Sequence, residues 1–166
     1  MRFELTTDRL HLAAVRLEDT ADLHAIFGDP LTHTIGNGPL ADAGQTRAWI
    51  ERRLATAAGL GLVWYAIRAR GSDTIIGNCG VFVGRTSEEE PEIGYEISYG
   101  LRGRGLAREA ASAVLHEALE SGAQRLWATI RSANAASLRV AQQIGMVRDR
   151  VEYDDKGELV YLRSTT

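Results

Sequence analysis

The chain has 166 residues, of which 45% are hydrophobic and 25% are charged, so it has the size and composition of one soluble globular domain over residues 1–166. Its formal net charge is −3, so the chain lacks the excess of basic residues that is typical of a nucleic-acid-binding protein. A single cysteine, Cys79, excludes an intramolecular disulfide.

The first part of the chain predicts one strand followed by two helices. Apolar and smaller or polar residues alternate over residues 10–15, which is the period of a strand. A first helix is expected over residues 18–28, because an acidic start precedes a buried apolar stripe and a glycine closes it. Residues 29–39 are rich in turn formers and should be a surface loop. A second helix is expected over residues 42–59, beginning with capping-box spacing at Asp42.

The middle of the chain predicts three consecutive antiparallel strands. Residues 63–68, 74–83 and 93–99 are rich in apolar, β-branched and aromatic side chains. The turns between them fall at residues 70–73 and 85–91, where glycine, serine, aspartate and proline are frequent. These strands are expected to form a meander.

The stretch from Ile93 to Leu119 predicts a strand, a glycine-rich loop and a helix in direct succession. The loop contains Gly100, Gly103 and Gly105, and helical periodicity starts at Leu106. A helix that starts in such a loop leaves several N–H groups without intrahelical acceptors and adds the positive end of the helix dipole. The sequence therefore predicts an anion site here, with positive charge supplied by Arg102, Arg104 and Arg108.

The remainder of the chain adds one strand, one helix and a hairpin. The strand at residues 125–130 must run parallel to residues 93–99, because a helix connects the two. Asn134 or Ser132 can cap the next helix, and a hairpin over residues 147–163 ends the pattern. The expected fold class is α+β, with a mixed, mostly antiparallel sheet of about seven strands, two parallel central strands and about four helices.

Two common nucleotide-binding motifs do not match the glycine loop. A P-loop requires Lys-Ser/Thr after its last glycine, whereas Leu106 and Ala107 follow Gly105. The dinucleotide fingerprint requires a third glycine, and Arg108 occupies that position.

The loop instead resembles the acyl-CoA pyrophosphate loop Arg/Gln-x-x-Gly-x-Gly/Ala of the GCN5-related N-acetyltransferase superfamily, as Arg102-Gly-Arg-Gly105-Leu-Ala107. Further likeness lies in Thr7-Asp-Arg-Leu-His-Leu12 and in the stretch from Asn134 to Met146. The branch that it resembles contains the bacterial ribosomal-protein N-terminal acetyltransferases of the Rim type. Three motifs in the right order are more specific than one loop.

This resemblance implies acetyl-CoA as the cosubstrate. No metal is expected, because the sequence has no histidine and cysteine clusters with metal-ligand spacing. The resemblance further implies that two splayed parallel strands admit the pantetheine arm, with Asn134 beside that arm. Backbone N–H groups of Ile97, Ser98 and Tyr99 are expected to be left unpaired by the splay and to bind the donor. The loop residues expected to hold the pyrophosphate are Arg102, Gly103, Arg104, Gly105, Leu106 and Ala107.

Two carboxylates are candidates for the base that the amine acceptor requires. Glu92 and Glu96 lie four residues apart on one strand, so their side chains point to the same face. The resemblance favours Glu92, with Glu96 or a water-mediated route as the alternatives. Rim-type enzymes carry a glutamate on the following strand, where this chain has Thr129.

The acid that protonates the departing thiolate has a less direct candidate. Many members of the superfamily place a tyrosine seven residues after the motif asparagine, where this chain has Ala141. Ser137 matches a serine that approaches the CoA sulfur in the resembled branch, and it is equally an ordinary first-turn helix residue.

The acceptor itself is expected to be a primary amine, preferentially the α-amino terminus of a protein or peptide. Polyamines, amino acids or aminoglycosides are the alternative acceptors, and a noncatalytic acyl-CoA-binding module is the alternative to an enzyme. His33, Asn37 and Trp49 are candidates to line the acceptor site. No long apolar run or signal-peptide pattern is present, so a cytoplasmic protein without membrane or nucleic-acid partners is expected, as a monomer or a homodimer.

Overall fold

Eight strands form one sheet in the computed structural model, which describes residues 1–34 and 36–165. The sheet order is β1-β2-β3-β4-β5-β6-β8-β7, and only β5 and β6 pair in parallel within the described residues. The strands are β1 (Glu4–Thr6), β2 (Leu10–Ala14), β3 (Trp64–Ala69), β4 (Ile75–Phe82), β5 (Glu92–Ile97), β6 (Trp127–Arg131), β7 (Met146–Asp154) and β8 (Gly157–Ser164).

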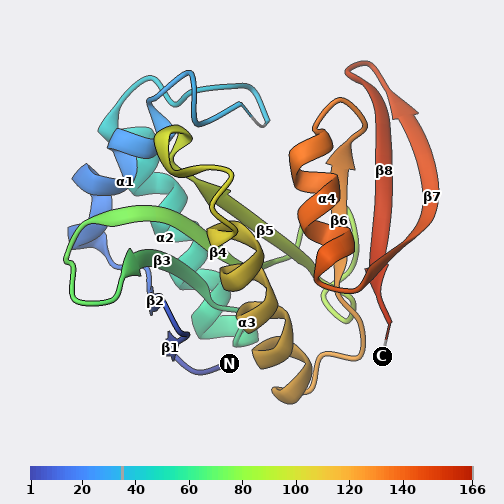
Figure 1. Cartoon of the computed structure of the whole chain (residues 1–166), viewed down its shortest axis with the longest axis horizontal. Helices are drawn as coiled ribbons and strands as arrows, with labels where there is room; N and C mark the ends of the chain where they lie inside the picture. The colour runs from blue at the N-terminus through green and yellow to red at the C-terminus, as the bar shows by residue number, and fades with distance from the viewer. Residues whose placement is uncertain (35, 166) are drawn as a thin grey trace.

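Four α-helices in this described part of the chain cover the two faces of the sheet (Figure 1). They are α1 (Thr20–Phe27), α2 (Ala43–Leu60), α3 (Leu106–Glu120) and α4 (Ala135–Gln143). Helices α3 and α4 pack on one face through Ala110, Val114 and Ala141, whereas α1 and α2 pack on the other through Leu23 and Ile50. The expected α+β class with a mixed sheet and four helices is confirmed.

Strand β1 is an addition to the expected set. It has three residues and pairs antiparallel with β2, from Glu4 opposite Ala13 to Thr6 opposite His11. Only Leu5 of this strand is buried, so the sequence offers no alternating pattern long enough to reveal it.

The sheet opens between its two parallel strands. Their register contains one pair, Glu92 opposite Trp127, beside a 2.8 Å hydrogen bond from the Trp127 N–H to the Pro91 carbonyl. Beyond this point β5 continues along β4, and the Ser98 N–H still donates to the Ile76 carbonyl at 3.0 Å. The predicted splay is therefore present, and it leaves one edge of β5 facing a gap in the sheet.

Local capping places the two helices that flank this gap. Gly105 has φ 75°, a left-handed conformation that favours glycine, and its carbonyl accepts the first α3 hydrogen bond from the Glu109 N–H at 3.0 Å. At the start of α4, Asn134 Oδ1 accepts from the Ser137 N–H at 3.1 Å. Of the two predicted caps, Asn134 is the one used.

Candidate active site

A cavity of about 500 Å³ lies between the end of β5, the start of α3 and one face of α4. Its lining combines backbone and arginine donors at the α3 end with hydroxyl and carboxylate groups of Ser137, Tyr95 and Glu96. The cavity thus connects a helix start with the donor pattern that suits an anion to a set of groups that can exchange protons.

The helix start of α3 has the donor pattern that an anion requires. Because the first helical bond comes from Glu109, the N–H groups of residues 106–108 have no intrahelical acceptor. Gly103 has φ 77°, so both Gly103 and Gly105 shape the loop without side chains. Among the predicted loop residues, Arg102, Gly103, Gly105, Leu106 and Ala107 line the cavity. Arg104 does not line it, and one of its guanidinium nitrogens lies 3.5 Å from the Gly100 carbonyl oxygen.

Arg9, in the turn between β1 and β2, holds this loop in place by hydrogen bonds. Its Nη1 donates to the Arg104 carbonyl at 3.0 Å, and its Nε lies 2.6 Å from Glu109 Oε2. Thr7 Oγ1 also donates to Glu109 at 2.6 Å. The first turn of α3 is therefore fixed to the N-terminal strands, a contact between residues about 100 positions apart that no local pattern indicates.

The predicted donor triplet at the end of β5 is only partly available. The Ser98 N–H bonds to Ile76, and the Tyr99 N–H donates to Thr32 Oγ1 at 2.9 Å, so the expectation that the splay leaves both unpaired is wrong. Neither residue lines the cavity, whereas Ile97 does. Since the antiparallel ladder to β4 uses alternate residues, the Ile97 N–H faces the gap instead, and the Ile97 carbonyl accepts from Arg102 Nε at 3.1 Å.

Glu96 is the carboxylate that reaches the cavity. It is 8% exposed and lines the cavity, and both of its carboxylate oxygens lie 3.0 Å from His33 Nδ1. Asn78 Nδ2 donates to Glu96 Oε2 at 3.4 Å. The carboxylate is thus held by two side chains while still bordering the cavity, as a proton acceptor at a defined position must be.

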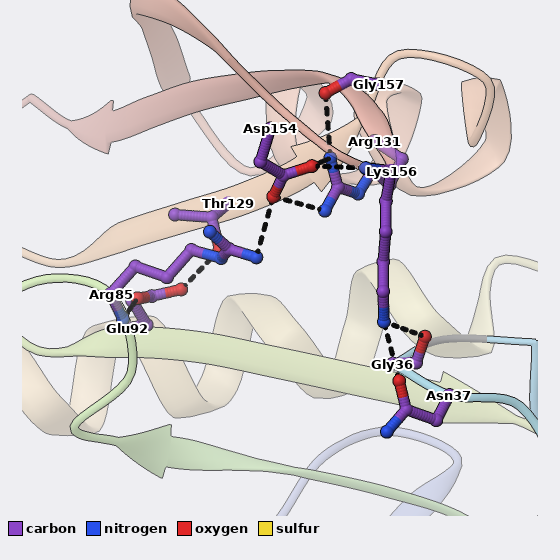
Figure 2. Close-up of polar contacts among 9 residues, drawn as sticks. All are labelled: Gly36, Asn37, Arg85, Glu92, Thr129, Arg131, Asp154, Lys156 and Gly157. Carbon is purple, nitrogen blue, oxygen red and sulfur yellow. Dashed lines mark hydrogen bonds and ion pairs between the residues drawn. The ribbon is translucent and has the colours of Figure 1, made fainter.

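Glu92 lies elsewhere and is occupied. It is 2% exposed, is not part of the cavity wall, and accepts hydrogen bonds from the N–H groups of Arg85 and Thr86. Thr129 Oγ1 donates to its other oxygen at 2.6 Å (Figure 2). We therefore no longer favour Glu92 over Glu96 as the base. The Glu92 carboxylate joins the β4–β5 loop to β6 and does not border the cavity.

Ser137 and Tyr95 form a hydroxyl pair at the cavity wall. Ser137 Oγ donates to the Tyr95 hydroxyl at 3.2 Å, and that hydroxyl donates to the Ser137 carbonyl at 2.8 Å. Burial raises the pKa of Tyr95 to about 12, so the phenol stays protonated at neutral pH. Two hydrogen bonds thus join Tyr95 of β5 to Ser137 of α4.

The three predicted acceptor residues lie in different surroundings. His33 contacts Glu96, as described above. Trp49 packs edge-on against Phe27 and Trp64, with ring centroids 4.8 and 5.2 Å away, and does not line the cavity. The side chain of Asn37 accepts a hydrogen bond from Lys156.

Several cavity residues were missed by the sequence reasoning. They are Thr32, Thr34, Tyr95, Leu101, Ala136, Arg139, Val140 and Gln143. Those on α4 recur at three- and four-residue spacing from Ala136, so helical periodicity could have assigned them to the face that carries Ser137. No group of three or more potential metal ligands occurs in residues 1–34 and 36–165, and none of the helices described there has the length and apolar character needed to cross a bilayer.

Comparison with known proteins gives consistent matches. The acetyltransferase (GNAT) domain family model matches residues 9–147. YkkB of Bacillus subtilis (strain 168) is 33% identical over 146 residues, covering 86% of this chain and 84% of YkkB. An acetyltransferase from Agrobacterium tumefaciens strain C58 has a TM-score of 0.85 at 26% identity, over 100% of this chain and 96% of its own. RimL, a ribosomal L7/L12 α-N-protein acetyltransferase solved with coenzyme A, has a TM-score of 0.81 at 16% identity, over 96% of this chain and 95% of its own.

Proposed function

Since the chain belongs to the acetyltransferase (GNAT) domain family, we propose that it transfers the acetyl group of acetyl-CoA to the α-amino group of a protein or peptide N-terminus. Acetyltransferase activity follows from the family, and the α-amine acceptor is the proposal. The observation that supports acetyl transfer at this site is the cavity, which joins the free N–H groups at the start of α3 to the Glu96 carboxylate. Residues 1–166 would act as one N-acetyltransferase domain.

The residues of the cavity fit acetyl-CoA, which supplies the acetyl thioester when it binds. The free N–H groups of residues 106–108, the glycine backbone and the positive charge of Arg108 suit a pyrophosphate, whereas the Arg102 guanidinium is bonded to the Ile97 and Thr32 carbonyls. Leu106, Ala136 and Val140 offer apolar surface for a pantetheine arm, with Asn134 among them as a polar contact. Coenzyme A in RimL and acetyl-CoA in the YncA structure from Salmonella typhimurium support this assignment.

We assign to Glu96 the removal of the proton from the acceptor amine. An amine must lose its proton to attack a thioester carbonyl, and Glu96 is a cavity-lining carboxylate with its geometry fixed by His33 and Asn78. The α-amine as acceptor is taken from the resemblance to the Rim-type branch and from the activity of RimL.

We assign to Ser137 the protonation of the departing CoA thiolate, and this role can be tested by mutation. Ser137→Ala is expected to lower kcat about a hundredfold, the lower end of the usual acid–base contribution, with acetyl-CoA affinity nearly unchanged. Tyr95→Phe should lower kcat about tenfold, because it removes one hydrogen bond that orients Ser137. Steady-state kinetics with calorimetric binding of acetyl-CoA measures both effects.

The double variant decides whether Tyr95 acts through Ser137. If it does, Tyr95→Phe adds no further loss in the Ser137→Ala background. Ser132→Ala is a suitable control, because Ser132 is an exposed serine just before α4 that does not line the cavity. Additive losses in the double variant would contradict the positioning role of Tyr95.

Thiol release from acetyl-CoA tests the proposed function. Peptides with different free N-termini are compared with polyamines, amino acids and aminoglycosides as acceptors, and with the same peptides blocked at the N-terminus. The proposal expects the highest kcat/KM with free N-terminal peptides and no release with blocked ones. A clear preference for a small amine would overturn the α-amine assignment and leave the acetyltransferase activity intact.

A further inference from the structure

Two segments far apart in sequence meet across the opening of the sheet. Lys156, in the turn between β7 and β8, donates from Nζ to Asn37 Oδ1 at 2.6 Å and to the Gly36 carbonyl at 3.2 Å (Figure 2). Gly36 and Asn37 belong to the loop between α1 and α2. Strands β5 and β6 share one register pair, so the β1–β5 and β6–β8 parts of the sheet separate beyond it. The Lys156 contact links the two parts across this opening.

The turn that carries Lys156 is rigidly braced. Arg131 donates from Nη1 and Nη2 to the two Asp154 carboxylate oxygens, both at 2.7 Å, and Arg85 adds a contact to Asp154 Oδ2 at 3.2 Å. The hydrogen bond from Arg131 holds the pKa of Asp154 well below its ordinary value. Asp154 Oδ1 also accepts from the Lys156 N–H at 2.9 Å, so the start of the lysine side chain is fixed (Figure 2).

The ammonium of Lys156 has no carboxylate partner among the residues that the structure describes. Its two acceptors, Gly36 O and Asn37 Oδ1, are neutral, and the nearby Asp154 is already paired with two guanidinium groups. A negatively charged group that displaced Asn37 would pair with Lys156 more strongly than these amide oxygens do.

The bridge lies on the same loop as a partner of the proposed base. His33, four residues before Asn37, contacts Glu96. Lys156 and Asn37 do not line the cavity that Glu96 borders, so a contact between Lys156 and an acceptor requires the acceptor to enter along this loop.

We propose that Lys156 selects acceptors that carry a negative charge close to the reacting amine, so that the preferred substrate is an acidic peptide N-terminus. This rests on the proposed function and names its substrate class. In the free protein the ammonium bonds to Asn37 and Gly36. On acceptor binding it exchanges Asn37 for the carboxylate of the acceptor.

The test uses three peptides with a free N-terminus that differ only at the second residue, which is Asp, Asn or Lys. At low ionic strength the wild-type protein should show kcat/KM about fivefold higher for the Asp peptide than for the Asn peptide, and lowest for the Lys peptide. Lys156→Met keeps the length of the side chain and should remove this preference, whereas Lys156→Arg should keep it. The preference should fade as salt is raised above about 0.15 M.

Asn37→Ala separates the charge of Lys156 from its hydrogen bond to the α1–α2 loop. It removes the Asn37 amide oxygen and leaves the Lys156 ammonium in place. The Asp-over-Asn preference should survive in that variant. An equal preference in wild type and Lys156→Met would overturn the proposal. Calorimetry of peptide binding to the CoA-loaded protein gives the same comparison without turnover. Absence of peptide acetylation would reject the proposed function. The ratio of the affinities for the Asp and Asn peptides would still decide the role of Lys156.

Discussion

Gly105→Asp is expected to reduce acetyl-CoA binding by at least about a hundredfold. Gly105 has φ 75° and precedes the free N–H groups of α3, so an aspartate there is strained and places a negative charge where the pyrophosphate must lie. Two charge-assisted hydrogen bonds lost at about 1.5 kcal/mol each suffice for that factor. Calorimetry with acetyl-CoA measures the affinity directly.

Two controls separate charge from strain. Gly105→Ala imposes the same left-handed strain without charge, so it should bind acetyl-CoA much better than the aspartate variant. Gly122→Asp makes the same substitution after the other end of α3, where φ is 105° and no heavy atom lies within 4 Å of an added Cβ. If Gly105→Asp retained wild-type affinity, the pyrophosphate could not lie at this helix start.

Glu96→Gln is expected to lower kcat/KM about a hundredfold near pH 7 with little change in acetyl-CoA affinity. Glutamine has nearly the same shape and can still accept from His33 Nδ1, but it cannot take a proton. An α-amino group has a pKa near 8, so above that pH the acceptor deprotonates unaided and the deficit should shrink. The pH profile of kcat/KM from about pH 6 to pH 9 measures this.

Glu92→Gln is the matched control, because it makes the same change at a buried carboxylate on the same strand that does not border the cavity. It should lower the unfolding free energy by about 1–3 kcal/mol, since the charge-assisted hydrogen bonds from the N–H groups of Arg85 and Thr86 become neutral ones, and the Thr129 hydroxyl meets an amide nitrogen in place of the oxygen to which it donates. Its kcat/KM should stay close to wild type at temperatures where it is folded. Equal activity losses in the two variants, without pH dependence, would remove Glu96 from the role of base.

The sequence was sufficient for the elements that depend on local signals. The stripe from Leu106 and the left-handed Gly105 mark the start of α3, and the cap at Asn134 marks the start of α4. The parallel pairing of β5 and β6 follows from the helix between them. The anion end of the cavity was predictable for the same reason, because a loop and a helix start lie within a few consecutive residues.

The sequence could not separate Glu92 from Glu96. Strand periodicity places both on one face, and what distinguishes them comes from other segments. Thr129 and the β4–β5 loop occupy Glu92, whereas His33, 63 residues away, meets Glu96. Pairing of the Tyr99 N–H with Thr32 is of the same kind, because it depends on how a loop distant in sequence folds back on β5.

Localisation of the transferred acetyl group tests the central claim most directly. The protein is incubated with isotopically labelled acetyl-CoA and a peptide that has both a free N-terminus and an internal lysine, and tandem mass spectrometry assigns the label to one nitrogen. Label on the α-nitrogen, strongly reduced in Glu96→Gln and retained in Glu92→Gln, is the predicted result. Label on the lysine side chain alone, or none on the peptide while a small amine is acetylated, would contradict the account.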